Sequence, residues 1–207
     1  MADLAHDPYR LILVGVGGQG TLTLAQMIME VARRSGYRAL QSEIHGMSQR
    51  GGTVYAYLSV SRGAILTPAA MEASSHLLIA LEPLEALRYL PYLRSDALLF
   101  VAREPVRTLP DYPDDPTLFA ALEAVPGATL VDTPALAQTL RLKQAGGMAL
   151  LGLAARRLPF DAEVWRSVIV PQRHVQLRDA LPRHDGLEEV VLSRRPRHPT
   201  ATLRRAR

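Results

Sequence analysis

A short stretch of the sequence, residues 42–52, gathers side chains of several kinds that can do chemistry. It reads SEIHGMSQRGG and offers a carboxylate, an imidazole, an amide and a guanidinium, on Glu43, His45, Gln49 and Arg50. Its glycines leave the backbone open to close approach by a ligand or another chain. A glycine-rich loop with Arg and Gln suits a phosphate, a carboxylate or the surface of a partner protein. Each of these residues alone is more often an ordinary solvated side chain, so only the combination indicates a site.

A second stretch, GVGGQG at residues 15–20, is a glycine-rich turn between a predicted strand and a predicted helix. Its Gly15, Gly17 and Gly20 match the spacing G-x-G-x-x-G. The glycines permit positive φ, and the helix that begins at Thr21 offers unpaired N–H groups and a positive dipole end to an anion. The N–H groups of residues 17–20 could form an anion-binding nest. Such glycines also occur for tight packing alone, so the motif by itself does not decide whether a ligand binds.

The position of Glu43 in the sequence is also compatible with a dinucleotide-binding enzyme. It lies 23 residues after Gly20, near the end of the second predicted strand, where dinucleotide-binding enzymes place an acid for the ribose. One interpretation is therefore an NAD(P)- or flavin-binding Rossmann oxidoreductase. A dinucleotide site needs few polar residues after that acid, whereas His45, Ser48 and Arg50 follow here within seven residues. The other interpretation is a polar surface for a different ligand or for a partner.

The elements that must position these stretches alternate between strands and helices. Apolar runs and β-branched residues predict strands at residues 10–14, 37–42, 53–61, 76–81, 97–102 and 128–133. Helical patterns cover residues 21–35, 83–90 and 145–158 and begin again at residue 134, while residues 108–116 read as a surface loop. This order predicts an α/β fold, a three-layer Rossmann-like single domain with a mostly parallel sheet. Ligands bind at the carboxyl ends of such strands, so both stretches should lie at the same edge of the sheet.

Composition excludes several classes of protein. The 207 residues contain no cysteine, which rules out disulfides, thiolate metal ligands and any iron–sulfur cluster held by this chain alone, and we expect no metal site. The net charge of +4 comes from the last fifteen residues, which hold six arginines and no acid. We expect a folded domain at 1–192 and a disordered basic tail at 193–207, so nucleic-acid binding is not favoured. No long apolar run or secretory signal is visible, which predicts a cytoplasmic protein without a membrane span.

Three phrases together resemble a known family. The block E-x-H-G-M-S-Q-R-G-G at residues 43–52 is highly specific, and the phrase LEPLEALRYLPYL follows at residues 81–93. With GVGGQG, they make residues 10–180 similar to the gamma domain of 2-oxoacid:ferredoxin oxidoreductases. The EPLEAL phrase favours the beta subunit of the indolepyruvate:ferredoxin oxidoreductase branch over the pyruvate branch.

The resemblance implies a subunit of a complex that oxidatively decarboxylates an indolepyruvate-type or other aryl 2-oxoacid. The expected products are acyl-CoA, carbon dioxide and reduced ferredoxin, with coenzyme A as cosubstrate. In this family thiamine diphosphate, Mg and the 4Fe-4S clusters belong to a large alpha subunit. This chain is therefore expected to hold no cofactor alone and to be inactive in isolation. Its expected partners are that alpha subunit, ferredoxin and coenzyme A, in a hetero-oligomer.

The resemblance also suggests roles for the two stretches. Coenzyme A is the expected ligand of the glycine turn, and Arg50 is expected to pair with a phosphate or with the substrate carboxylate. Supporting catalytic roles are expected for His45, Gln49 and Arg50, while Glu43 should contact the thiamine-bearing subunit. The residues expected to bind or border a cofactor are Gly15, Gly17, Gly18, Gln19, Gly20, Thr21, Glu43, Gly46, Ser48, Gly51 and Gly52.

Overall fold

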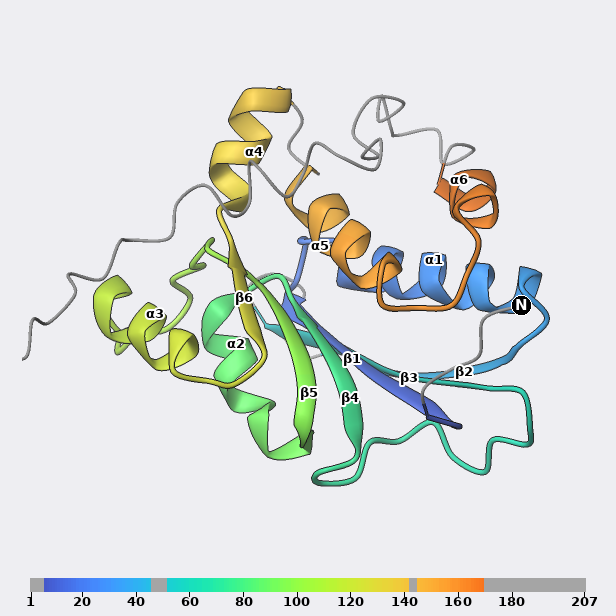
Figure 1. The fold of residues 1–207 in the computed structure, drawn as a ribbon. Coiled ribbons are helices and arrows are strands. Elements are labelled where there is room, and N and C mark those ends of the chain that lie inside the picture. The colour runs from blue at the N-terminus through green and yellow to red at the C-terminus, as the bar shows by residue number, and fades with distance from the viewer. Residues whose placement is uncertain (1–5, 46–51, 142–144, 170–207) are drawn as a thin grey trace, which may run out of the picture.

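A six-stranded β-sheet runs through the middle of the computed structural model (Figure 1). The structure describes residues 6–45, 52–141 and 145–169, without the side chains of residues 44 and 45. The strands are β1 (Tyr9–Val16), β2 (Arg38–His45), β3 (Thr53–Ser61), β4 (Ser75–Ala80), β5 (Leu93–Ala102) and β6 (Ala128–Val131), in the spatial order β2-β3-β1-β4-β5-β6. Strands β1, β4, β5 and β6 pair in parallel, whereas β3 runs antiparallel to its neighbours β1 and β2. The mostly parallel sheet predicted from the sequence is confirmed.

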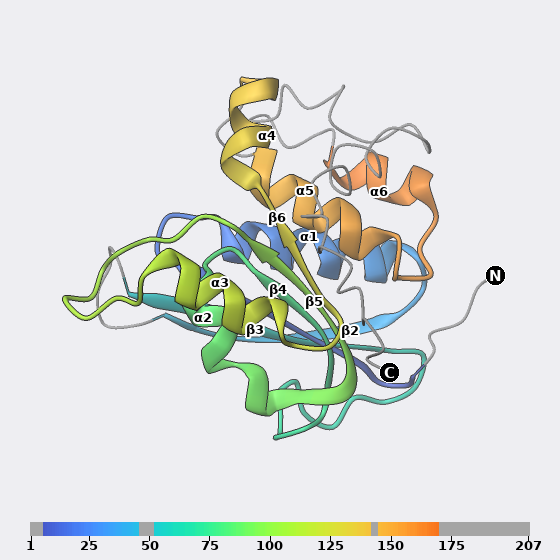
Figure 2. The ribbon, with the colours of Figure 1, turned by 60° about the vertical axis from the view of Figure 1, so that its left-hand side comes forward.

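Helices cover both faces of this sheet, as the two views in Figures 1 and 2 show. On one face lie α1 (Thr21–Arg34), α5 (Ala145–Ala155) and α6 (Ala162–Ile169), and on the other lie α2 (Pro83–Arg88) and α3 (Asp115–Glu123). Helix α4 (Thr133–Leu140) follows β6, and a short 3-10 helix, η1 (Leu90–Tyr92), leads from α2 into β5. The predicted three-layer Rossmann-like fold is therefore confirmed.

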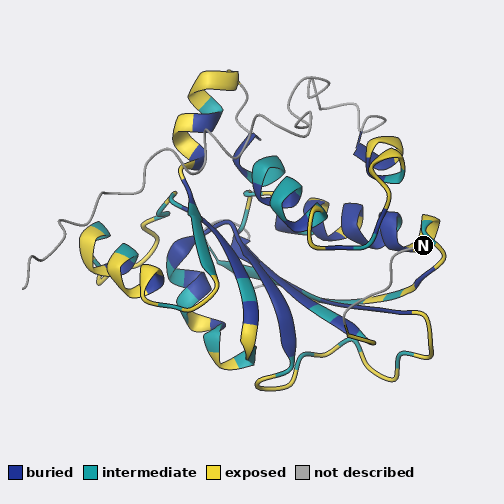
Figure 3. Ribbon diagram, in the orientation of Figure 1, coloured by how far each residue is buried: buried dark blue, intermediate teal, exposed yellow. Residues whose placement is uncertain are grey.

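The sheet separates two apolar cores. In β1, Leu11 and Leu13 belong to the core shared with α1, while Ile12 and Val14 belong to the core shared with α2. Successive side chains of a strand point to opposite faces, so a strand covered on both faces must be apolar almost throughout. Figure 3 shows β1 and β4 buried along nearly their whole length, in contrast to the exposed outer sides of the helices. The run LILV in β1 is apolar for this reason.

Helix α1 ends where its sequence dictates. Gly36 has a φ of +82°, a conformation that side chains with a Cβ rarely adopt. The Gly36 N–H donates to the Arg33 carbonyl and the Tyr37 N–H donates to the Ala32 carbonyl, both at 3.0 Å. These two bonds form a Schellman motif, which satisfies carbonyls that the end of a helix leaves open. The chain then turns directly into β2.

The turn between β1 and α1 is held together by the side chain of Gln19. Its Oε1 accepts a hydrogen bond from the Val16 N–H at 2.7 Å, and its Nε2 donates to the Leu81 carbonyl at 3.0 Å. Gly18 and Gly20 have positive φ values of 100° and 86°, which the tight reversal requires. The Gln19 amide therefore ties the turn to the end of β4.

Gly15 is required by space. A Cβ at this position would lie 2.6 Å from the Thr21 hydroxyl oxygen, 2.9 Å from the Gln19 Oε1 and 3.1 Å from the Leu81 Cβ. The first two contacts are shorter than packed atoms tolerate, so helix α1 could not approach β1 this closely with any larger residue. The first glycine of the motif serves helix–strand packing.

The structure differs from the sequence predictions in several details. Strand β2 continues to His45, three residues beyond its predicted end, so Glu43 is a strand residue. The sequence patterns do not predict α3, whose N-cap Asp114 accepts a hydrogen bond from the Thr117 N–H at 2.9 Å. The predicted boundary between residues 192 and 193 lies outside the described residues. Among the helices of the described residues, none has both the length and the apolar composition that crossing a bilayer requires.

A histidine lies buried near the start of β4, at the end of the sheet away from the glycine turn. His76 is 8% exposed, and its Nδ1 accepts a hydrogen bond from the Arg10 N–H at 3.0 Å. The rings of His6 and Tyr9 stack on it, with centroid distances of 4.5 and 4.9 Å. Burial lowers the pKa of His76 to about 4, and the nearby charges of His6, Arg94 and Arg10 act in the same direction. The fold therefore favours the neutral imidazole.

We expect Gly15→Ala to lower the free energy of unfolding by roughly 1–3 kcal/mol, because the new methyl group overpacks the turn. Urea unfolding followed by circular dichroism would measure the change. Gly152→Ala, in α5, is the matched control, since its Cβ would meet nothing within 4 Å. That substitution removes a glycine from a helix and should stabilise by up to about 1 kcal/mol. Two variants of equal stability would contradict the packing role of Gly15.

His76 should make the stability of the protein depend on pH between about 6.5 and 4. Its folded pKa lies below the unfolded value, so the unfolded chain binds more protons in this window. Stability is then complete above pH 6.5 and falls as the pH drops, by at most about 1.4 kcal/mol per pH unit from this group. His76→Asn keeps an acceptor for the Arg10 N–H but does not titrate, so its stability should fall less steeply. Parallel curves for the two proteins would show that His76 does not contribute.

Candidate functional site at the carboxyl edge of the sheet

The two stretches singled out in the sequence meet at one edge of the sheet. Val16, the last residue of β1, pairs with Thr53, the first residue of β3. His45, the last residue of β2, pairs with the second residue of β3. The Gly17 N–H donates to the Gly52 carbonyl at 3.0 Å, which joins the two loops directly. The prediction that both stretches lie at the carboxyl edge is confirmed.

The N–H groups of the glycine turn divide into two pairs. Those of Gly17 and Gln19 donate within the chain, the second of them to the Val16 carbonyl at 3.1 Å. Gly18 and Gly20 are exposed, and their N–H groups have no partner within the part of the chain that the structure describes. Gly20 is the N-cap of α1, and no side chain caps the first turn there. An anion can therefore meet N–H groups at the start of α1, although not all four that the sequence suggested.

Thr21 lies under this turn. It is 2% exposed, and its hydroxyl has no hydrogen-bond partner among the described residues. Its oxygen occupies the space that a Cβ on Gly15 would need. The side chain therefore packs between α1 and β1, and contact with a ligand above the turn would have to come from its backbone N–H.

The position of Glu43 argues against a dinucleotide site. In a Rossmann fold the ribose-binding acid stands at the end of a strand directly beside the glycine-bearing strand. Here β3 lies between β1 and β2, so Glu43 is separated from the glycine turn by two strand spacings, or about 10 Å. Glu43 pairs with Ala56 of the neighbouring strand β3 and accepts a hydrogen bond from the Gln41 Nε2 at 2.9 Å. This geometry does not bring the carboxylate to a ribose bound at the turn.

The central part of the second stretch lies outside the described residues, namely Gly46, Ser48, Gln49, Arg50 and Gly51. His45 is described only as the backbone that ends β2, and Gly52 through its bond to Gly17. The structure thus fixes where this loop leaves the sheet and where it returns. The roles suggested for its side chains stay predictions.

A pocket of about 150 Å³ lies beside the joined loops. Its lining includes Val16 and Gly52 of the joined loops, the N-cap Glu82 and the first-turn Glu85 of α2, and Leu109 of the segment after β5. Cofactor sites are typically about 300–1,000 Å³, so this pocket is too small for coenzyme A or a dinucleotide. Among the described residues, no three side chains of His, Asp or Glu are grouped as a metal ion would require.

Glu82 holds the walls of this pocket together. It is 1% exposed and stands at the N-cap of α2, where its Oε2 accepts a hydrogen bond from the Glu85 N–H at 2.7 Å. Its Oε1 accepts from the Val106 N–H at 3.3 Å and from the Tyr112 hydroxyl. Burial, followed by this bond to Glu82, raises the pKa of Tyr112. One carboxylate thus connects α2 with the segment that precedes α3.

Glu85 is the second carboxylate of the pocket, and it is incompletely bonded. It is 5% exposed, and its Oε1 accepts a hydrogen bond from the Arg88 Nη1 at 2.8 Å. Its Oε2 is buried without a hydrogen-bond partner among the described residues. Burial raises the pKa of the Glu85 carboxyl, against the opposing effect of Arg88 and the Thr53 hydroxyl.

The sequence interpretation assigned no role to Glu82 or Glu85, although both stand in the LEPLEAL phrase. A signal was present, because an acid, a proline and a second acid three positions later follow a buried strand. That order is typical of a helix N-terminus with a capping carboxylate. It does not reveal that the segment after β5 folds back onto the same carboxylates.

Comparison with known proteins gives this edge a family context. The family model described as pyruvate ferredoxin/flavodoxin oxidoreductase matches residues 10–175. The indolepyruvate oxidoreductase subunit IorB of Thermococcus kodakarensis is 40% identical over 101 residues, which are 47% of this chain and 48% of that protein. The protein of the same name from Archaeoglobus fulgidus is 41% identical over 91 residues, 44% of each chain. The aligned regions thus span about half the length of these curated relatives.

Solved structures show the same fold. The gamma subunit of a keto/oxoacid ferredoxin oxidoreductase from Geobacter sulfurreducens superposes with a TM-score of 0.60 at 20% identity, covering 81% of this chain and 86% of that chain. A 2-oxoglutarate:ferredoxin oxidoreductase from Magnetococcus marinus, with 2-oxoglutarate, coenzyme A and succinyl-CoA bound, gives a TM-score of 0.62 at 13% identity. It covers 79% of this chain and 26% of that chain. With a family model matched over residues 10–175, the chain belongs to the pyruvate ferredoxin/flavodoxin oxidoreductase family.

Proposed function

We propose that this chain is the non-cofactor subunit of a 2-oxoacid:ferredoxin oxidoreductase of the indolepyruvate type. The complex would convert an aryl 2-oxoacid and coenzyme A to acyl-CoA and carbon dioxide and would reduce ferredoxin. Support comes from the family match over residues 10–175 and from the IorB relatives, to which about half of the chain is similar. The 207 residues contain no cysteine, so the iron–sulfur clusters of such a complex would be ligated by another chain.

The observation that carries the proposal is the junction of the two loops through the Gly17–Gly52 hydrogen bond. It holds the glycine turn against Gly52, the last residue of the 43–52 block, at the edge where α/β proteins bind ligands. The nearby pocket is too small for a cofactor. A glycine turn beside a pocket too small for a cofactor suits contact with a cofactor held by another subunit.

We expect coenzyme A to meet this edge through its phosphates. The exposed N–H groups of Gly18 and Gly20, at the start of α1, are suited to an anion. Arg50 is the cation that we expect to assist there, or to meet the substrate carboxylate instead. Thiamine diphosphate would supply the carbanion chemistry from the large subunit, while this chain orients and shields the reacting groups. We also expect the complex to be cytoplasmic.

Affinity purification of the full chain from its native cell tests the assembly. We expect a large subunit to co-purify, with thiamine diphosphate and iron in the eluate. The isolated chain should neither decarboxylate an aryl 2-oxoacid nor bind NAD(H) in a calorimetric titration. Tight NAD(H) binding by the isolated chain would favour the dinucleotide interpretation instead.

Within the purified complex, Arg50→Ala should lower turnover with an aryl 2-oxoacid by roughly 10–100-fold, the effect of losing a hydrogen bond to a charged group. Arg166→Ala is the matched control, because Arg166 is exposed on α6. Reduction of ferredoxin under substrate saturation measures both variants. Unchanged kinetics for Arg50→Ala would remove Arg50 from the site.

A further inference from the structure

In the pocket beside the joined loops, one buried carboxylate oxygen makes no hydrogen bond of ordinary geometry, and the Thr53 hydroxyl is the neutral polar group of this chain that acts on its carboxyl. Glu82 receives three neutral donors, whereas the Oε2 of the buried Glu85 has no partner among the described residues. A buried carboxylate oxygen without a donor costs free energy, and it is strongly stabilised when a donor or a cation arrives. Since Glu85 lines the pocket, a donor or cation that enters the pocket can reach this carboxylate.

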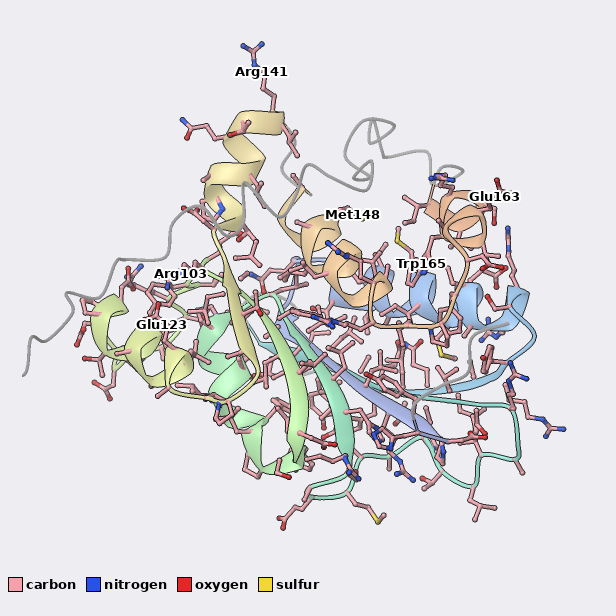
Figure 4. The ribbon with its side chains drawn as sticks, in the orientation of Figure 1. Arg103, Glu123, Arg141, Met148, Glu163 and Trp165 are labelled. Carbon is pink, nitrogen blue, oxygen red and sulfur yellow. The ribbon has the colours of Figure 1, made fainter. Side chains whose placement is uncertain are left out.

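The charges around the pocket leave a negative excess. Among the described residues that line the pocket, Arg88 is the one cation beside Glu82 and Glu85, and its half-exposed guanidinium bonds the Oε1 of Glu85. The arginines of the neighbouring segment are engaged elsewhere, because Arg103 pairs with Glu123 and Arg107 with Asp115. Figure 4 shows Arg103 and Glu123 together at α3. The pocket is therefore suited to a cationic guest.

The volume of the pocket and its apolar lining further restrict which cationic group could bind there. A volume of about 150 Å³ is about half that of the smallest typical cofactor sites but accommodates the end of a long side chain. Val16, Val106 and Leu109 supply apolar lining, and Glu82 and Glu85 supply carboxylates. The methylene groups of Lys or Arg pack well on such walls while the charged end meets an acid.

We propose that this pocket receives a lysine or arginine side chain of the large partner subunit, whose charged end pairs with Glu85. This inference rests on the proposed function, which places the partner at this edge. Val16 and Gly52 belong both to the pocket and to the joined loops, so the pocket is continuous with that surface. Insertion of this side chain would fix the position of one subunit relative to the other.

The test uses the full chain and the co-purified large subunit as the probe. Glu85→Gln keeps the shape of the side chain and removes its charge. We expect the dissociation constant of the two subunits to rise by about 30-fold or more, since breaking a buried charge pair costs binding strongly. Its dependence on salt should become weaker at the same time. Glu163→Gln, on the exposed side of α6 in Figure 4, is the control and should leave the dissociation constant within about twofold of wild type.

A second variant keeps the carboxylate and fills the pocket. Leu109 is 43% exposed at the pocket, and Leu109→Trp should weaken assembly as Glu85→Gln does. Thermal unfolding of the isolated Glu85→Gln chain should occur at or above the wild-type temperature, because the substitution removes a buried charge. Weaker assembly of a chain that is at least as stable as wild type cannot come from misfolding.

If both Glu85→Gln and Leu109→Trp bound the large subunit with wild-type affinity, the inference would be overturned. The pocket would then hold water and no side chain of the partner. An own-chain cation would overturn it as well. In that case Arg50→Ala would lower the melting temperature of the isolated chain, and the effect would vanish in the Glu85→Gln background. If no thiamine- and iron-containing subunit co-purifies, the proposed function itself fails. A subunit that assembles without sensitivity to Glu85 defeats only the inference about the pocket.

Discussion

The hydrogen bond from the Gly17 N–H to the Gly52 carbonyl is the contact on which the arrangement of this edge depends. It exists because β3 begins beside the end of β1 and runs antiparallel to it, so the chain entering β3 passes the glycine turn. Residues 43–45 end β2, the outermost strand, and β3 brings the chain back from there to the glycine turn. One antiparallel insertion into a parallel sheet thus turns two separate motifs into one surface.

This surface combines opposite electrostatic characters over a short span. The start of α1 presents exposed N–H groups and the positive end of a helix dipole, which attract anions. Beside it, Glu82 and Glu85 give the start of α2 a buried negative character. A partner that matches both regions must carry an anionic ligand and a basic side chain in a fixed relation. Such paired complementarity specifies orientation more than it adds affinity.

The sequence predicted the architecture well because the strongest patterns lie in the central strands and in α1. Burial on both faces demands apolar runs in the strands, and α1 shows a clear apolar face. It also placed both motifs at the correct edge, since that follows from strand direction alone. It failed for α3, which begins within a stretch of prolines and aspartates that reads as a loop and whose start is marked mainly by Asp114. It also gave no sign that β3 separates Glu43 from the glycine turn, because strand order depends on contacts between residues distant in the chain.

The site was predicted less completely for the same reason. Glycine spacing correctly indicated a tight turn, but not that Gln19 would use its amide to bind β4. The pocket depends on Tyr112 and Val106 folding back onto Glu82, across more than twenty positions in sequence. No local pattern encodes that return. Pairings of this kind become visible only in three dimensions.

Because the sheet separates two apolar cores, the sequences on its two sides can change independently. The apolar cluster around α1 and the cluster around α2 share no side chains, so substitutions in one should combine additively with substitutions in the other. The layer that supports α1 can therefore stay constant while the layer under α2 and α3 changes its composition. Relatives could in this way acquire new neighbours on one side of the molecule and keep an unaltered glycine turn.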